Sequence, residues 1–197
     1  MSEQQGMDQG PQLTAYCLQC DTGYEMYVSS LIQELFRDVT AYAVMQEKHQ
    51  SKAGVKSIVR MNLLPGYVFL YSHKSPPFRE ILPLHHIYRF LSYGDFEEYG
   101  LRGTDLDFAV WVLRHEGLLT SSKAVQIGSK VHIVQGPLCD AVGTIEKVDR
   151  HNRNVCLSIS FDGNMKRVWM PFEWTDDAEG FKTSPLDTNN GCRGGET

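Results

Sequence analysis

The stretch VHIVQGPLCDAVGTIEKVDRHNR, residues 131–153, carries the strongest fold signal in the chain. Its first residues alternate between apolar and polar, which predicts a half-buried strand. Gly136-Pro137 and then Gly143 interrupt the alternation, because proline cannot donate to a strand ladder and glycine permits a bulge or a close backbone approach. The stretch ends in a cluster of basic and histidine residues. We therefore predict barrel corners at Gly136, Pro137 and Gly143, and a projecting hairpin tip at residues 147–153.

Further short strands surround this stretch and predict a small closed β-barrel over residues 125–175. Glycine, proline, asparagine and aspartate mark the turns between the strands, a pattern that is typical of all-β units. The expected strands are Lys130–Val134, Gly143–Val148, Val155–Phe161 and Lys166–Phe172.

Residues 13–115 show a different pattern, in which strands are interspersed with two long helices. This order predicts an α+β unit with an antiparallel sheet and flanking helices. Thr22–Glu25 and Thr104–Asp107 have the spacing of capping boxes and predict the two helix starts. The expected strands are Thr14–Gln19, Val39–Met45, Lys56–Leu63, Tyr67–Tyr71 and Ile87–Leu91, with a short helix at Phe78–Leu82.

Helical spacing also predicts which side chains are buried. The expected core face of the first long helix consists of Tyr24, Tyr27, Val28, Leu31, Leu35 and Phe36, and that of the second consists of Leu106, Val110 and Leu113. Polar composition predicts disordered tails at residues 1–12 and 176–197, a hairpin loop at Gln46–Val55, and a linker between the two units at residues 116–124.

The overall composition is typical of a soluble globular protein, with 42% hydrophobic and 22% charged residues. No apolar run approaches the ~20 residues that span a bilayer, and the N-terminus lacks the layout of a signal peptide. We therefore expect a cytoplasmic monomer without membrane contact. The net charge is -5, yet residues 123–175 carry seven basic and five acidic side chains. This local balance favours a polyanionic partner for the barrel.

Motifs for catalysis or cofactor binding are missing from the sequence, including phosphate-cradling, dinucleotide and nucleophile-elbow motifs. Cys17 and Cys20 form a C-x-x-C pair, but the expected helix begins too late to lower a thiol pKa, and no second pair completes a zinc site. His85 and His86 would point to opposite faces of a strand. We predict a binding protein that is not an enzyme and needs no metal or cofactor. A thiol oxidoreductase using Cys17 and Cys20 is the remote alternative.

Over roughly residues 14–175 the chain resembles the NusG family of transcription elongation factors. Residues 15–25, AYCLQCDTGYE, are similar to the opening strand and helix start of the family's NGN domain, and residues 63–71, LLPGYVFLY, to its proline–glycine–tyrosine strand. The opening stretch looks like a KOW motif within an SH3-like barrel. The resemblance implies an NGN domain at residues 13–115 and a KOW domain at residues 125–175.

The resemblance also implies a function. In NusG-like proteins the NGN domain binds the clamp helices of the largest RNA polymerase subunit and promotes processive elongation and antitermination. The positions that match the family's polymerase-binding patch are Leu64, Pro65, Gly66 and Tyr67. The alternative within the family is a housekeeping NusG, whose KOW domain binds a termination factor or a ribosomal protein.

The run Asp149–Arg153 and the linker residues 116–119, EGLL, are most similar to the LoaP subgroup of specialised NusG paralogues. This similarity implies that the KOW domain contacts a nascent RNA hairpin. The candidate RNA-binding residues, expected to lie near one another, are Lys147, Arg150, His151, Arg153, Lys166 and Arg167. A solvated turn is the competing interpretation. Phe161-Asp162-Gly163 departs from the family pattern, in which Phe-Gly precedes a basic residue.

Overall fold

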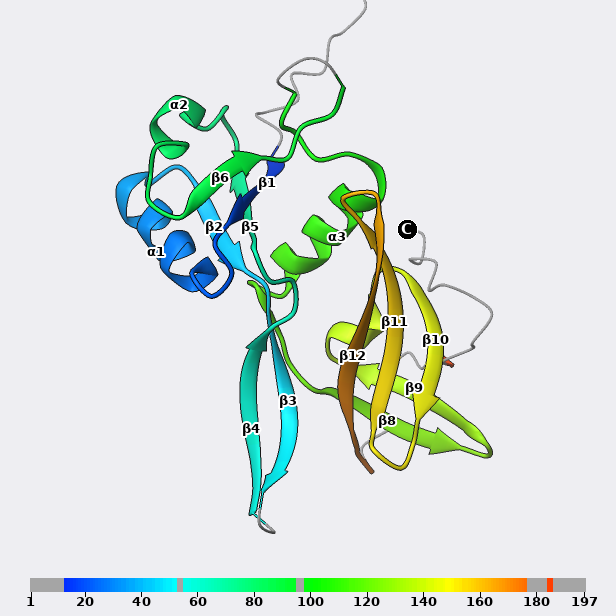
Figure 1. Cartoon of the computed structure of the whole chain (residues 1–197). Helices are drawn as coiled ribbons and strands as arrows, with labels where there is room; N and C mark the ends of the chain where they lie inside the picture. Colours follow the sequence, from blue (N-terminus) through cyan, green and yellow to red (C-terminus); the bar gives the residue numbers. More distant parts are fainter. Residues whose placement is uncertain (1–12, 53–54, 95–97, 177–183, 186–197) are drawn as a thin grey trace, which may run out of the picture.

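The computed structural model describes residues 13–52, 55–94, 98–176 and 184–185, and it confirms the α+β fold class (Figure 1). An antiparallel sheet flanked by helices is followed by a curled half-barrel sheet. The expected tails at 1–12 and 176–197 fall largely outside the described residues.

The N-terminal sheet has the strand order β2-β5-β1-β6, and all of its neighbours are antiparallel. Its strands are β1 (Thr14–Cys20), β2 (Thr40–Ala43), β5 (Tyr67–Ser72) and β6 (Ile87–Phe90). Helices α1 (Glu25–Leu35) and α2 (Phe78–Ile81) cover one face, and α3 (Gly103–Arg114) covers the other (Figure 1).

Burial on both faces explains the continuous apolar run in β5. Val68 and Leu70 join the core beneath α1, whereas Phe69 and Tyr71 join the core beneath α3. A strand that is covered on both sides needs apolar residues at every position rather than at alternate ones.

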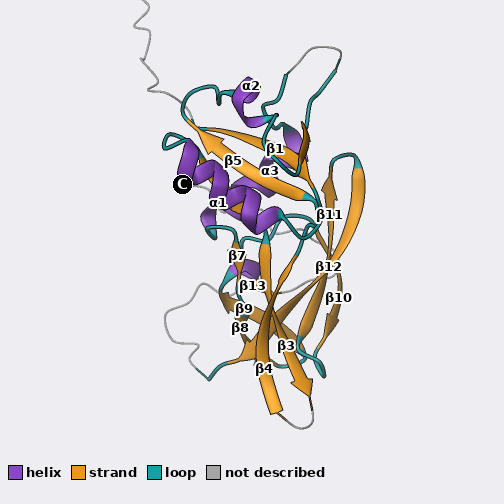
Figure 2. Cartoon of the chain, turned by 60° about the vertical axis from the view of Figure 1, so that its left-hand side comes forward, coloured by secondary structure: helices purple, strands orange, loops and turns teal. Residues whose placement is uncertain are grey.

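A long hairpin projects from this sheet (Figure 2). It consists of β3 (Met45–Lys52) and β4 (Val55–Asn62), which pair antiparallel along their whole length. The hairpin predicted here is confirmed, but its loop at Gln46–Val55 was predicted too long: the polar composition suggested a loop, whereas residues 46–52 pair with β4 as part of β3. The two-residue strand β7 (Leu118–Leu119) adds to β3 in parallel, so part of the predicted linker is strand.

The half-barrel has the strand order β10-β11-β12-β8-β9-β13. Its strands are β8 (Ser122–Ile127), β9 (Lys130–Gln135), β10 (Thr144–Asp149), β11 (Asn154–Phe161), β12 (Asn164–Trp174) and β13 (Ser184–Pro185), with a 3-10 turn η1 (Pro137–Cys139) after β9. In the described part of the chain, β10 and β13 form the two edges and do not pair with each other. The closed barrel expected from the sequence is therefore a curled open sheet. Strand β8 starts inside the predicted linker, and β13 lies inside the predicted tail.

Neither long helix starts with the predicted capping box. No side-chain cap hydrogen bond is present at the start of α1 or α3, and Thr104 lies inside α3. The carboxylate of Glu25 instead accepts hydrogen bonds from the backbone N–H of Gly23 at 3.0 Å and of Gly66 at 2.6 Å. Because Gly66 lies outside the helix, this tertiary contact ties the start of α1 to the turn before β5.

The predicted helix faces are also partly wrong. Val28 of α1 is buried, as predicted, but Tyr24, Tyr27 and Leu35 are 45%, 52% and 52% exposed. In α3 the buried apolar residues are Phe108, Ala109, Trp111 and Val112, whereas Leu106, Val110 and Leu113 are only half-buried. Helix α3 packs against the sheet and against the half-barrel, so a pattern based on one buried face does not describe it.

Gly143 connects the 3-10 turn to β10 in a conformation that only glycine adopts easily. Its φ is +106°, and an added Cβ would lie 2.4 Å from the carbonyl oxygen of Ser158. The register between β10 and β11 also shifts between Ile145 and Lys147. Backbone therefore approaches backbone closely at this corner.

Replacing Gly143 by alanine should lower the free energy of unfolding by about 3 kcal/mol or more, because a backbone clash adds to the cost of a positive φ. Urea unfolding measures this. The matched control is Gly128→Ala, since Gly128 has a φ of +59° but open space around its Cβ position. The control should lose only about 1–2 kcal/mol. Equal losses in the two variants would contradict the close approach.

Candidate interaction surfaces

The Leu64–Tyr67 turn lies at the start of β5, and its residues differ in exposure. Leu64 is 4% exposed and belongs to the core, whereas Pro65 is exposed. Gly66 has a φ of +84°, the left-handed region that favours glycine. Leu64, one of the four positions expected to form a polymerase-binding patch, is therefore not at the surface. Pro65 and Tyr67 are the members of the turn that another molecule could reach.

Glu25 holds this turn against the start of α1. Burial opposes ionisation of the carboxyl, but the N–H donors of Gly66 and Gly23 outweigh it, so the pKa of Glu25 is lowered. The backbone N–H of Cys20 also donates to the carbonyl of Gly66 at 2.9 Å. These contacts fix the backbone that presents Pro65 and Tyr67.

Tyr67 joins the N-terminal unit to the half-barrel. Its hydroxyl donates to Asp162 Oδ2 at 2.9 Å and accepts from Gln19 Nε2 at 3.0 Å. Its ring meets Phe161 edge to face, with centroids 5.4 Å apart. Burial and the nearby Asp162 carboxylate raise the pKa of Tyr67. The side chain that was predicted to bind polymerase thus contacts another part of the same chain.

Phe161 fills the aromatic face of the N-terminal unit, which we define as Tyr67, Phe69 and Phe108. It is fully buried, and its ring centroid lies 5.2 Å from that of Phe69 and 5.4 Å from that of Phe108. Phe69 is itself fully buried. Aromatic pairs at these distances add to the stabilisation from buried area.

Asp162 connects the half-barrel to the N-terminal unit through its backbone and its side chain. Its backbone N–H donates to Asp105 Oδ1 at 3.0 Å, and Asp105 Oδ2 accepts from the Tyr93 hydroxyl at 2.7 Å. Asp162 has a φ of +51°, a conformation that aspartate tolerates better than most residues. Both its backbone and its carboxylate therefore bond to the N-terminal unit.

The other end of α3 contacts the Gly136-Pro137 corner. Trp111 Nε1 donates to the carbonyl of Pro137 at 3.0 Å, and His115 Nε2 lies 2.9 Å from Asp140 Oδ1. Gly136 has a φ of +97°, and an added Cβ would lie 2.8 Å from Ser122 Cα. The half-barrel is thus attached to α3 at two separate points.

The six candidate RNA-binding residues do not form one cluster. Lys147, Arg150, His151 and Arg153 are all exposed on β10 or in the turn that follows it. Lys166 lies toward the opposite end of the sheet, with its ammonium 5.9 Å from the centroid of the Tyr67 ring. The residue of β11 that pairs with Lys166 lies six positions after Arg153. Lys166 and Arg153 are therefore about 20 Å apart along the strand direction.

The turn between β10 and β11 is the exposed basic tip, which we define as Arg150, His151 and Arg153. Arg150 donates to the carbonyl of Ser129, which ties the tip to the turn between β8 and β9. Hydrogen bonds from the backbone and side-chain amides of Asn152 lower the pKa of Asp149. An ionised carboxylate therefore shapes the turn while three basic side chains project from it.

The thiols of Cys17 and Cys20 do not have the environment of a redox site. Both residues are buried. Burial raises the pKa of Cys17, and burial together with Glu25 raises that of Cys20 to about 12. A catalytic thiol needs the opposite shift, because the thiolate is the nucleophile.

Within residues 13–52, 55–94, 98–176 and 184–185, no group of three or more metal-ligating side chains comes together. The same residues include no helix that is long and apolar enough to cross a membrane.

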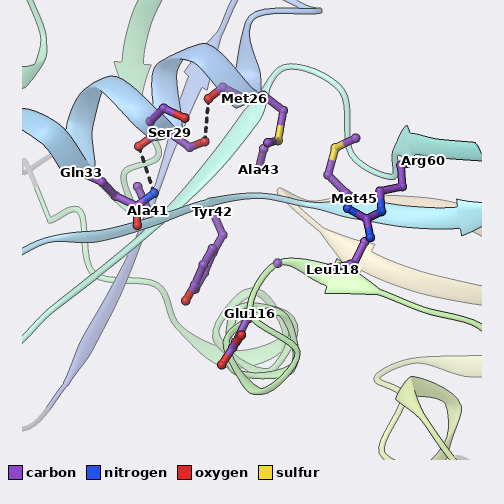
Figure 3. Close-up of a pocket in the computed structure, with 12 residues that line it drawn as sticks. Met26, Ser29, Gln33, Ala41, Tyr42, Ala43, Met45, Arg60, Glu116 and Leu118 are labelled. Carbon is purple, nitrogen blue, oxygen red and sulfur yellow. Dashed lines mark hydrogen bonds between the residues drawn. The ribbon is translucent and has the colours of Figure 1, made fainter.

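A shallow pocket of about 230 Å³ lies between α1, β2 and the base of the hairpin (Figure 3). Met26, Met45 and Leu118 supply apolar surface, and Arg60 and Glu116 are its charged residues. Arg60 lies 3.8 Å from Glu47, which is outside the pocket. The lining offers no nucleophile with an adjacent base.

No protein-family model matches the chain, and neither does any curated protein. Among solved structures, the chain is similar to NusG of Thermotoga maritima, in a structure of its domain interaction, with a TM-score of 0.48 and 19% identity over 81% of this chain and 94% of that one. It is also similar to the MjSpt4:Spt5 complex, with a TM-score of 0.27 and 14% identity over 88% of this chain and 99% of that one.

A double-mutant cycle of Tyr67→Phe and Asp162→Ala should give a coupling free energy of about 1.5 kcal/mol, since a hydroxyl bonded to a carboxylate is lost. Urea unfolding of the two single variants and the double variant measures it. The control pairs Asp162→Ala with Tyr71→Phe, because the Tyr71 hydroxyl donates to the carbonyl of Ala109 within the N-terminal unit. The control pair should be additive. Additivity in both cycles would contradict the hydrogen bond between the units.

Proposed function

We propose that this protein is a NusG-like transcription elongation factor that binds RNA polymerase through its N-terminal unit. The observation that carries the proposal is the aromatic face of Tyr67, Phe69 and Phe108, which closes around Phe161 from a different sheet. A surface that accepts an aromatic side chain from the half-barrel is suited to accept an apolar side chain from the clamp helices, since buried aromatic contacts dominate such interfaces. The resemblance at residues 63–71 implies polymerase binding at the same part of the sheet, which supports the proposal.

The docked half-barrel adds a condition to this mechanism. Phe161 and Asp162 occupy the surface that the polymerase would use, so the two contacts compete. Binding then requires the half-barrel to leave, and polymerase shifts the population toward the released form only by its stronger affinity for that form. Once released, the half-barrel remains tethered near the emerging transcript at a high effective concentration.

We further propose that the half-barrel contacts nascent RNA, as in the LoaP subgroup, and that the protein promotes antitermination. The support is the exposed basic tip of Arg150, His151 and Arg153. Lys147 lies close to the tip along β10, whereas Lys166 and Arg167 would be secondary contacts. The alternative is that the half-barrel binds a termination factor or a ribosomal protein instead of RNA. Measurements of RNA binding distinguish the two.

Replacing Pro65 by glutamate should lower co-purification of RNA polymerase with the tagged full-length protein by about tenfold, because a charge would enter an apolar contact. Phe161→Ala should raise co-purification by freeing the aromatic face. Pro83→Glu is the matched control, since Pro83 is also exposed but lies between α2 and β6. Unchanged co-purification in the Pro65 and Phe161 variants would refute the proposed surface. Read-through of a terminator on leader templates, with and without the protein, then tests the direction of the effect.

Reversing the charges of Arg150 and Arg153 to glutamate should weaken binding to a leader RNA hairpin and flatten its salt dependence, because fewer counterions are released. Fluorescence anisotropy at several salt concentrations measures both effects. The control reverses Arg79 and Arg89, two exposed arginines of the N-terminal unit. If hairpin affinity is the same for both double variants, the RNA role of the tip is wrong.

A further inference from the structure

Trp169 is a large apolar side chain that the half-barrel leaves at its surface. It lies on β12 and is 44% exposed, whereas its neighbours Val168 and Met170 point inward and are buried. It is not an isolated exposed residue. Met165 and Arg167, on the same face of the strand, are also exposed.

Strand register extends this face across three strands. Trp169 is opposite Cys156 of β11, and Cys156 is opposite Lys147 of β10. In the next row, Arg167 is opposite Ser158, and Ser158 is opposite Thr144. Short side chains thus occupy the middle strand in both rows, and in the row of Trp169 a long side chain stands on each side of it. We define the tryptophan platform as Lys147, Met165, Arg167 and Trp169.

The charges on the platform surround Cys156. Burial raises the pKa of Cys156 and Glu146 raises it further, whereas Arg167 and Lys147 oppose this shift. Arg167 Nε lies 2.8 Å from Glu146 Oε2, but its side chain is still 74% exposed. Two cations and one carboxylate therefore lie around Cys156, the residue opposite Trp169 in the strand pair.

We propose that the tryptophan platform binds unpaired nucleotides of the RNA, a refinement that rests on the proposed function. Trp169 stacks on a base, and Lys147 and Arg167 contact the phosphates next to it. Exposed aromatic rings next to cations are the elements with which proteins bind single-stranded RNA, because every base has a face for stacking. Duplex RNA keeps its bases stacked inside the helix and leaves an indole without a partner.

The surroundings of Trp169 favour RNA over a protein partner. A protein contact that centres on tryptophan normally has a ring of other side chains that excludes water from it. Here the rows beside the ring carry the exposed side chains of Lys147, Arg167 and Thr144, and Glu146 is paired with Arg167. Positive charges and hydroxyl groups suit a phosphodiester backbone better than an apolar protein surface.

The platform and the basic tip are neighbours along the chain at β10. Lys147 lies on β10 only a few residues before Arg150. An RNA hairpin on the tip would therefore direct its unpaired flanking nucleotides toward Trp169. The platform is exposed while the half-barrel is docked, so both forms of the protein present it.

The test measures binding of the full-length protein to a labelled 20-nucleotide oligouridine and to a blunt-ended RNA duplex of the same length. Trp169→Ala should weaken binding to the oligouridine by about tenfold or more, and Trp169→Phe should retain most of the affinity. Trp169→Ala should leave the salt dependence unchanged, whereas Arg167→Gln should reduce the slope by about 0.7. Duplex binding should change little in Trp169→Ala. Ile127→Ala, an exposed residue of β8, is the control.

Equal affinity of Trp169→Ala and the unmodified protein for oligouridine would overturn the platform. Loss of hairpin binding on charge reversal of Arg150 and Arg153 in the same series would still support the proposed function. Equal losses in Trp169→Phe and Trp169→Ala would overturn stacking as the cause. If the Trp169→Ala variant loses polymerase co-purification but keeps its RNA affinity, the platform binds a protein rather than RNA, and the proposal is wrong. If the unmodified protein binds neither RNA, the platform and the proposed RNA role fail together.

Discussion

Insertion of Phe161 into the aromatic face of Tyr67, Phe69 and Phe108 is the contact on which the arrangement of the two units depends. It merges the core beneath α3 with the core of the half-barrel. The hydrogen bonds of Asp162 orient the inserted Phe161, because the backbone N–H of Asp162 donates to Asp105 and its carboxylate accepts from Tyr67. Apolar burial supplies most of the stabilisation, and these polar contacts determine which residues of the half-barrel meet the sheet.

Much of the fold could be predicted from local patterns. The apolar run of β5 and the alternation in β9 indicated these two strands, because strand periodicity depends on which faces are covered. Alternation within β12 places Trp169 outward, opposite to Val168 and Met170, although its role becomes visible only beside Lys147 and Arg167. Gln46–Val55 was misassigned because pairing with β4 overrides a polar composition. The tyrosines of α1 were misassigned because Glu25 and Ser29 occupy buried positions instead.

The candidate surfaces were less predictable than the fold. A pattern at residues 63–71 identifies the turn, but only the tertiary structure reveals that Leu64 is in the core and that Tyr67 bonds to Asp162. The unusual Phe-Asp-Gly at residues 161–163 was visible in the sequence. The physical role of Asp162 was not, because its partners Asp105 and Tyr67 are distant along the chain. The basic residues illustrate the same limit. Strand register separates Lys166 from the tip by about 20 Å, a distance that composition does not encode.

Hydrogen exchange at the amide of Asp162 tests the central claim most directly, since this N–H bonds to Asp105 only while the half-barrel is docked. In the free protein the amide should be protected. At saturating RNA polymerase its protection should fall, whereas the amides of β5 and α3 should stay protected beneath the polymerase. If Asp162 remains fully protected while polymerase is bound, the half-barrel and the polymerase do not share this face, and the proposed competition is wrong.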